Sequence, residues 1–259
     1  MNGMAIQTVQ VSAALAGVVL LAYGMSRLLL RDPGRLGQRR TGAVAAIAMV
    51  LLLGALLWDV SASNGATIPA DAAVNAALAP YRNGILVPAF VWITSLGTGA
   101  TTSAVAVTTT GLLWAGRWTK LLLPLWGMLL GAQATTWGLK FAVARARPPF
   151  IEGVSAASPS FPSAHATVTL AIYGFVAYAV ARGRPDPRER FEVAFWTAAF
   201  IALVGFSRLF LSLHYLTDVA GGFLVGGLWL LAGCAAAEWM AALAPGGKSA
   251  RAAVPAKES

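Results

Sequence analysis

The chain has 259 residues, of which 58% are hydrophobic and only 11% are charged, and its mean hydropathy is +0.69. This composition cannot cover a globule with a polar surface, so it excludes an ordinary soluble domain and predicts an integral membrane protein. The formal net charge of +9 could suit nucleic acid, but the positions of the basic residues along the chain give it another meaning.

Stretches long and apolar enough to cross ~30 Å of hydrocarbon recur along the whole sequence. The first follows a nearly uncharged start, which argues against a cleaved secretory signal and favours a retained helix with its N-terminus outside. The expected spans are residues 9–30, 41–60, 86–115, 121–143, 165–181, 191–213 and 219–243.

Two segments between or within these spans carry their own signals. Residues 61–84 are small, polar and marked by proline, which suits an external loop with one short amphipathic helix at the membrane interface. Within the third span, residues 95–103 (SLGTGATTS) are rich in Gly, Ser and Thr. They permit close helix packing, but we expect a break between an interfacial piece and a shorter helix.

Basic residues set the topology of these spans. With the N-terminus outside, the inner segments carry 13 of the 19 Lys and Arg residues and the outer segments carry 5, as the positive-inside rule requires. The surplus charge is therefore a membrane signal, and we expect no nucleic-acid partner. The one cysteine, Cys234, has no partner for a disulfide or a thiolate metal site.

Three short blocks hold the residues able to do chemistry, and the topology places all three at the outer side. They are residues 140–148 (KFAVARARP), 162–165 (PSAH) and 207–218 (SRLFLSLHYLTD), and they include both histidines of the chain. The cations Lys140, Arg147 and Arg208, together with two imidazoles and a carboxylate, have the chemistry of a phosphate pocket. Charges in a membrane domain are costly, so their meeting at one surface favours a functional site.

The spacing within the blocks predicts local geometry. Lys140 and Arg147 are seven residues apart and share a face if the helix continues to Pro148. Arg145 lies off that face, and we expect it to reach toward lipid headgroups. A helix should begin at the second block, with Ser163 as its N-cap.

The third block pairs a histidine with an acid. His214 and Asp218 are four apart, so on a helix they would lie on one face, and the carboxylate would fix the tautomer of the imidazole. The external acids Asp71, Glu152 and Asp218 show no spacing typical of metal ligands. We therefore expect no metal and no other cofactor.

In order, the blocks match the pattern KxxxxxxRP, PSGH and SRxxxxxHxxxD. On these residues the chain resembles the type 2 phosphatidic acid phosphatase superfamily, which includes vanadium haloperoxidases and bacterial lipid phosphatases. The resemblance implies an all-α fold, a polytopic membrane helix bundle with a six-helix phosphatase core. Residues 1–40 would add an N-terminal transmembrane helix and a cytoplasmic loop, residues 41–243 would form the core, and residues 244–259 would be a disordered cytoplasmic tail.

The resemblance also implies roles. His214 would attack phosphorus and form a phosphohistidine, Asp218 would orient it, and His165 would protonate the leaving group and then activate water. The phosphoryl oxygens would be held by Lys140, Arg147, Arg208, Ser163 and the backbone amide of Ala164. Ala164 replaces the family's usual glycine, which keeps the N–H and adds a methyl group, and we expect activity to survive with a slightly tighter pocket.

A site at headgroup depth suits a lipid substrate in a bacterial inner (plasma) membrane, with the site facing the periplasm or exterior. By family analogy, undecaprenyl pyrophosphate ranks first, with phosphatidylglycerol phosphate and phosphatidic acid close behind. A phosphotransferase using the same intermediate is an alternative. A haloperoxidase fits less well because those relatives are soluble, and a transporter fits less well because the charges lie at span ends and no internal repeat is visible.

Overall fold

The computed structural model describes residues 35–62, 65–82, 84–149, 151, 153 and 156–242. Every regular element within these ranges is helical, as expected for an all-α membrane bundle. The predicted first span, at residues 9–30, and the predicted tail, at residues 244–259, lie outside the described residues.

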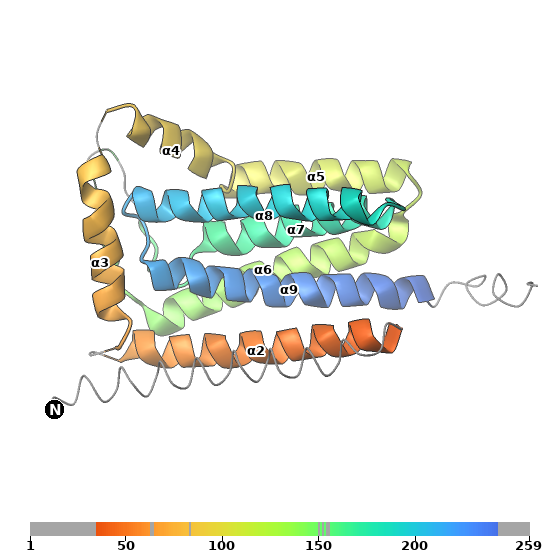
Figure 1. Cartoon of the computed structure of the whole chain (residues 1–259), viewed down its shortest axis with the longest axis horizontal. Helices are drawn as coiled ribbons and strands as arrows, with labels where there is room; N and C mark the ends of the chain where they lie inside the picture. Colours follow the sequence, from red (N-terminus) through yellow and green to blue (C-terminus); the bar gives the residue numbers. More distant parts are fainter. Residues whose placement is uncertain are drawn as a thin grey trace, which may run out of the picture.

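Most of the helices run side by side along one axis, and α3 lies across one end of the bundle (Figure 1). We call this end the α3 end. Two short 3-10 turns, η1 (Ala79–Tyr81) and η2 (Thr119–Leu121), connect neighbouring helices. The helices are α2 (Arg35–Ser61), α3 (Ile68–Leu78), α4 (Leu86–Ser95), α5 (Gly99–Ala115), α6 (Leu122–Val143), α7 (Ala164–Arg182), α8 (Pro187–Phe210) and α9 (Leu216–Ala242).

Four of the described helices are long and apolar enough to cross a membrane: Arg40–Ser61, Ala164–Arg182, Pro187–Phe210 and Leu216–Ala242. They coincide with four of the predicted spans. The α6 helix also lies where a span is predicted and has 22 residues, although its hydropathy is lower. The short helix expected in the loop at residues 61–84 is α3.

The third predicted span is broken, as expected. Helices α4 and α5 are bent by 40° relative to each other. The side chain of Thr98 starts the second piece, because its Oγ1 accepts a hydrogen bond from the Thr101 backbone N–H at 3.3 Å. The Gly, Ser and Thr run therefore ends one helix and caps the next, and Gly97 lies at the junction.

Glycines let α9 pack directly on α7. A Cβ on Gly222 would lie 2.6 Å from the backbone oxygen of Ser163, and a Cβ on Gly226 would lie 2.6 Å from that of Thr167. Small residues allow such close approach between membrane helices. At the α3 end, the Ser163 N–H donates to the Asp218 backbone oxygen at 2.9 Å, so the first turns of α7 and α9 are held together.

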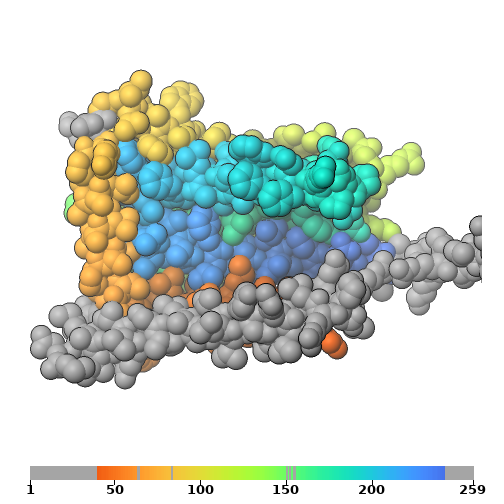
Figure 2. Space-filling view, in the orientation of Figure 1, coloured from red at the N-terminus to blue at the C-terminus, as the bar shows by residue number. Residues whose placement is uncertain are grey.

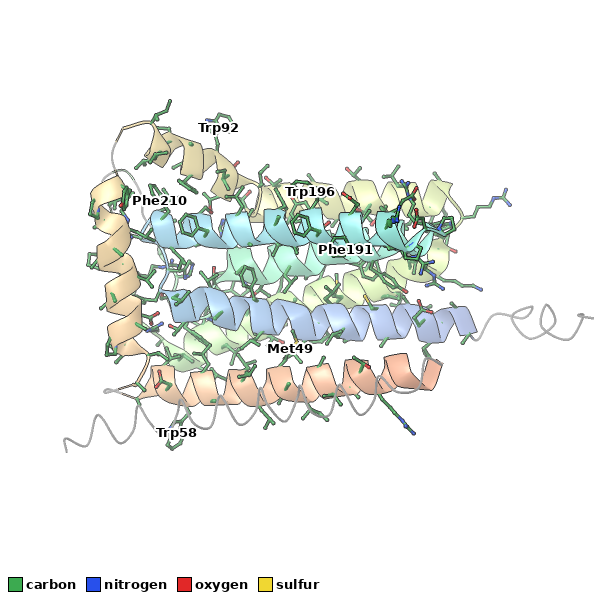
Figure 3. The ribbon with its side chains drawn as sticks, in the orientation of Figure 1. Met49, Trp58, Trp92, Phe191, Trp196 and Phe210 are labelled. Atoms are coloured by element: carbon green, nitrogen blue, oxygen red, sulfur yellow. The ribbon has the colours of Figure 1, made fainter. Side chains whose placement is uncertain are left out.

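Large aromatic side chains project away from the bundle. Trp58, Trp92 and Trp196 are 80%, 78% and 65% exposed, and Trp58 and Trp92 point away from the bundle in Figure 3. In space filling, α3 covers the end of the bundle while α8 and α9 form much of the visible face (Figure 2). Exposed apolar side chains on a helix bundle suit contact with lipid.

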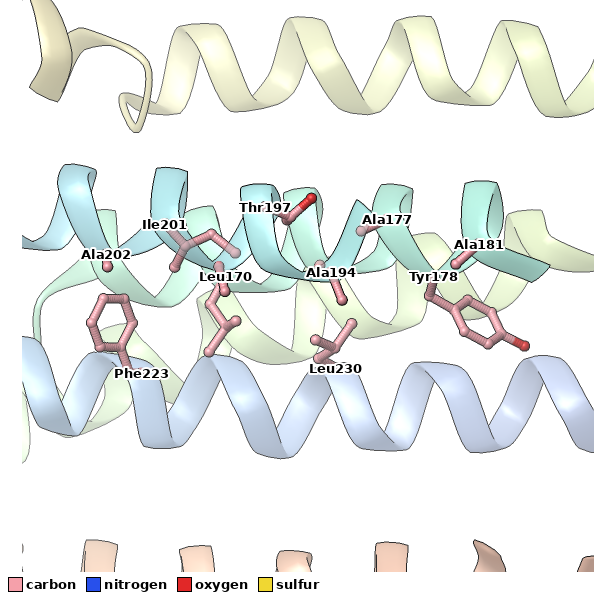
Figure 4. A pocket seen from close by; sticks show the side chains of 12 residues that line it. Leu170, Ala177, Tyr178, Ala181, Ala194, Thr197, Ile201, Ala202, Phe223 and Leu230 are labelled. Atoms are coloured by element: carbon pink, nitrogen blue, oxygen red, sulfur yellow. The ribbon is translucent and has the colours of Figure 1, made fainter. Parts of the chain in front are cut away.

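An apolar groove of about 490 Å³ runs between α7, α8 and α9. Figure 4 shows Leu170 of α7, Ile201 of α8 and Phe223 and Leu230 of α9 facing it. We call it the α7–α8–α9 groove. It contains none of the motif residues, so the chemistry predicted from the sequence has to lie elsewhere.

Candidate functional site

The structure brings the three motif blocks together at the α3 end. Lys140 lies in the last turn of α6 and is 1% exposed. Its ammonium group donates to the backbone oxygens of Pro159 and, at 3.4 Å, Ser160. Arg147 Nε donates to the Ser158 backbone oxygen at 2.8 Å. Both cations are therefore anchored on the same loop segment, 158–160.

The expectation that Lys140 and Arg147 share a helix face is wrong. Helix α6 ends at Val143, and Ala144 adopts a left-handed conformation with φ 48°, its N–H bonding to the Lys140 backbone oxygen at 2.9 Å. Residues 144–149 then leave the helix. In a continuing helix, Arg145 and Arg147 would point about 200° apart, whereas outside it both reach into the α3 end.

His214 lies in the turn between α8 and α9 and is 4% exposed. Its Nε2 atom is 3.2 Å from Arg147 Nη1. Its Nδ1 atom is 3.4 Å from Asp218 Oδ2 and has no hydrogen-bond partner among the described residues. Catalytic hydrogen bonds are often long before substrate binds.

The pairing of His214 with Asp218 is thus present, but the predicted helical basis for it is wrong. Helix α9 begins only at Leu216. The Tyr215 N–H donates to Asp218 Oδ2 at 2.8 Å, so the carboxylate caps the start of the helix and faces the imidazole at once. Helix α9 therefore starts after His214, and the Asp218 carboxylate both caps this start and faces the imidazole.

Burial and charge keep His214 neutral. Burial lowers the pKa of His214 to about 3, with Asp218 acting to raise it and Arg208 and Arg147 acting to lower it further. A histidine with this pKa is unprotonated at neutral pH. The lone pair of one ring nitrogen is then free to act as a nucleophile.

Ser163 precedes the first residue of α7 and has an extended backbone, as an N-cap should. The prediction that Ser163 is the N-cap is therefore confirmed, although its hydroxyl makes no cap hydrogen bond within the described part of the chain. Ser163 is fully buried, and its Oγ has no hydrogen-bond partner in those ranges. Buried polar atoms rarely stay unpaired, so this hydroxyl is available to a ligand.

His165 lies in the first turn of α7, next to the break between α4 and α5. A Cβ on Gly97 would lie 3.3 Å from the His165 ring carbon Cδ2 and 2.7 Å from Thr169 Oγ1. His165 also lies within electrostatic range of the other motif side chains, Arg208, His214, Arg147 and Lys140. The glycine at the junction therefore gives the break room to pack against this histidine.

Arg208 occupies the last turn of α8 and is 5% exposed. Its Nη1 donates to Thr94 Oγ1 of α4 at 2.7 Å. Its Nε atom has no hydrogen-bond partner in the described ranges. A buried guanidinium with an unused donor, within electrostatic range of Arg147 and Lys140, is chemically suited to bind a phosphate-like anion.

Sequence reasoning missed several residues that hold the site. The expectation that Arg145 reaches to headgroups is wrong: its guanidinium contacts Asp218 Oδ1 at 2.6 Å and Asp71 Oδ2 at 2.8 Å. Ser160 also donates to Asp218 Oδ2. Asp71 lies on α3, far from the motifs in sequence, so no local pattern could have found it.

The comparisons with known proteins concern the family and the fold. Residues 120–240 match the family model of the PAP2 superfamily. Phosphatidylglycerophosphatase B of Bacillus subtilis (strain 168) is 38% identical over 89 residues, which is 34% of this chain and 44% of that protein. The chain thus spans less than half the length of this curated relative.

A solved structure extends the likeness to the fold. The crystal structure of a transmembrane PAP2-type phosphatidylglycerolphosphate phosphatase from Bacillus subtilis superposes with a TM-score of 0.70 at 26% identity, covering 75% of this chain and 96% of that one. The resemblance predicted from the three blocks is therefore confirmed. Over residues 120–240 the chain is similar to the PAP2 superfamily, and it is a multi-span membrane protein whose regular elements, in the described ranges, are all helices.

Proposed function

We propose that this protein is an integral membrane phosphatase that hydrolyses a lipid phosphate or diphosphate through a phosphohistidine at His214. The observation that carries the proposal is the set of buried, unused polar atoms in the motif blocks that also hold the neutral His214: Ser163 Oγ and Arg208 Nε have no hydrogen-bond partner in the described chain. Such groups are costly to bury unpaired, and a phosphoryl group would satisfy them.

In this mechanism the phosphoryl oxygens are held by Lys140, Arg147 and Arg208, with Ser163 and the amide of Ala164. These cations neutralise the charge of the transition state. Because they take the part that a metal plays elsewhere, we expect turnover without added metal and in the presence of EDTA.

His214 attacks phosphorus in line, and the bond from phosphorus to the leaving oxygen breaks. His165 donates a proton to that oxygen, so the lipid departs as an alcohol, or as a lipid monophosphate with one less negative charge if the substrate is a diphosphate. His165 then removes a proton from water, which attacks the phosphohistidine and releases inorganic phosphate. Asp218 orients His214 and balances the charge on its ring.

The two relatives support the choice of substrate class. Each is described as a phosphatase of phosphatidylglycerol phosphate, which makes that lipid the first to test, beside undecaprenyl pyrophosphate and phosphatidic acid. We further propose that the site faces the exterior or periplasm of the plasma membrane, because the basic residues are concentrated in the opposite loops. Labelling of a cysteine introduced at Ala157 or at Arg184 by an impermeant reagent in intact cells distinguishes the two orientations.

The test is phosphate release by the detergent-purified protein from these three lipids, with and without EDTA. Trapping with a radiolabelled substrate should give a phosphoenzyme that is labile to acid, and His214→Ala should lose both the phosphoenzyme and turnover. Retained turnover in His214→Ala would overturn the mechanism. Appearance of the label on an added alcohol, in place of free phosphate, would instead favour the phosphotransferase, and vanadate should inhibit either enzyme.

A further inference from the structure

Asp218 is held from several sides. Its Oδ1 atom receives the Arg145 Nη1 donor at 2.6 Å. Its Oδ2 atom receives the Tyr215 N–H at 2.8 Å and the Ser160 hydroxyl. Oδ2 is also the atom that faces His214, so Arg145 holds the carboxylate by the oxygen turned away from the imidazole.

Arg145 is in turn held by Asp71 on α3. Asp71 Oδ2 lies 2.8 Å from Arg145 Nη2, and Asp71 also accepts from the Thr217 N–H at 3.0 Å and the Thr217 hydroxyl at 2.6 Å. The guanidinium lies 4.5 Å from the centre of the Tyr215 ring. Asp71 is 2% exposed and Arg145 13%, so water competes little for these contacts.

The electrostatics agree with this geometry. Burial opposes the charge of Arg145, but Asp218 and Asp71 together raise the pKa of Arg145 above its usual value. Arg145 is therefore a fixed cation between two carboxylates. Because Arg145 contacts both Asp71 and Asp218, removal of one of these carboxylates should shift the guanidinium and thereby change the position of the other.

We propose that Arg145 and Asp71 are positioning residues for catalysis: Arg145 fixes the orientation of the Asp218 carboxylate toward His214, and Asp71 fixes Arg145. The inference rests on the proposed function, in which His214 is the nucleophile. It also gives α3 a part in the chemistry, since Asp71 is the α3 residue that reaches this carboxylate through Arg145.

The competing explanation is that these residues only fasten α3 to the bundle, and Arg82 provides the matched control. Arg82 also ties α3 to the last turn of α8, donating to Asn75 Oδ1 at 2.6 Å and to the backbone oxygens of Phe210 at 2.6 Å and Leu209 at 3.0 Å. None of these contacts involves Asp218. Arg82→Gln should therefore loosen α3 without disturbing the carboxylate.

The experiment compares kcat and KM of purified Arg145→Gln, Arg145→Lys, Asp71→Asn and Arg82→Gln on the best lipid of the panel, together with their thermal unfolding. We expect Arg145→Gln to lower kcat by about 10- to 100-fold with KM within about threefold, and Arg145→Lys to recover part of the loss. Asp71→Asn should lower kcat less. Arg82→Gln should lower the unfolding temperature and leave kcat of the folded protein unchanged.

The double variant Asp71→Asn with Arg145→Gln tests whether Asp71 acts on Asp218 through Arg145. If Asp71 works through Arg145, the double variant should lose no more kcat than Arg145→Gln alone, because coupled residues are not additive. Multiplied losses, a loss confined to KM, or a kcat for Arg145→Gln equal to that of Arg82→Gln would overturn the proposal. If Arg145→Gln does not fold, Asp71→Asn decides, since asparagine has nearly the same size, and an unchanged kcat contradicts the inference.

These outcomes are separable from those of the proposed function. An active His214→Ala would show that the proposed function is wrong. An inactive His214→Ala together with normal kcat in Arg145→Gln and Asp71→Asn would remove only the positioning role.

Discussion

The α3 end and the α7–α8–α9 groove share helices, but the α3 end is lined by polar and charged side chains and the groove by apolar ones. At the α3 end, Lys140 and Asp218 are almost completely buried and the surrounding polar atoms are densely connected. The groove, of about 490 Å³, is lined almost wholly by apolar side chains. A layer that includes Ala166, Leu209 and Val219, with Phe223 packed against it, lies at the end of α7 nearest the motif residues.

This difference teaches where function and stability should separate. Buried charges are costly unless they are paired or bind a ligand, so the α3 end carries polar groups that stability alone would not require. The helix packing farther along the bundle is apolar and depends on shape. Substitutions of the buried motif residues at the α3 end should therefore change turnover, and those along the α7 and α9 contact should change stability.

The largest effect should come from Arg147→Gln. Loss of a cation that contacts His214 and the 158–160 loop should lower kcat/KM by about 10²- to 10³-fold, the usual cost of one transition-state donor. Phosphate release by the purified variant measures this loss. Arg184→Gln, at an exposed ion pair with Glu189 at the opposite end of α8, is the control and should remain active. A change of less than threefold in Arg147→Gln would show that this cation does not contact the substrate.

A smaller effect is expected from Ser163→Ala. Its hydroxyl makes no hydrogen bond in the described chain, so its removal should cost little stability but lower kcat/KM by about tenfold, near the value of one hydrogen bond to a charged group. Thr167→Ala is the matched control, because Thr167 is also buried on α7 but donates to the Ser163 backbone oxygen at 3.1 Å. Equal activities of the two variants would argue against a ligand at Ser163.

Gly226→Ala, at the contact between α7 and α9, should lower stability rather than turnover. The added Cβ would lie 2.6 Å from the Thr167 backbone oxygen, so α7 and α9 would have to move apart, and overpacking of this kind costs about 1–3 kcal/mol. Thermal unfolding in detergent should show the loss, while kcat at low temperature changes little. Gly138→Ala on α6 is the control, since nothing lies within 4 Å of its Cβ position. A lower kcat without lower stability in Gly226→Ala would contradict this separation.

The smallest effect should follow Ala164→Gly, which restores the residue usual in the motif. Ala164 is the first residue of α7 and fits a helix without strain, so we expect kcat/KM to change by less than about threefold. Stability should fall by up to ~1 kcal/mol through the lower helix propensity of glycine. A tenfold rise in kcat/KM would show that the alanine methyl group obstructs the phosphate.

The helices of this protein follow from local features of the chain, and so does the choice of chemistry. Apolar runs predict α2, α7, α8 and α9, and the Gly, Ser and Thr run predicts the break at Gly97. Two spacings were wrongly taken as helical, because α6 ends at Val143, before Arg147, and α9 begins at Leu216, after His214. In both cases a cap, at Ala144 or by the Asp218 carboxylate, replaced the helical turn.

The membrane class, the spans within the described chain and the three blocks with their cations and histidines thus follow from the amino-acid sequence alone. Only the tertiary structure decided that Ser163 keeps a free hydroxyl, that Gly97 packs against His165, and that Asp71 and Arg145 hold Asp218. The reason is the range of the interactions. Hydropathy and periodicity act between near neighbours in the chain, whereas α3 reaches the start of α9 only after the intervening helices have packed.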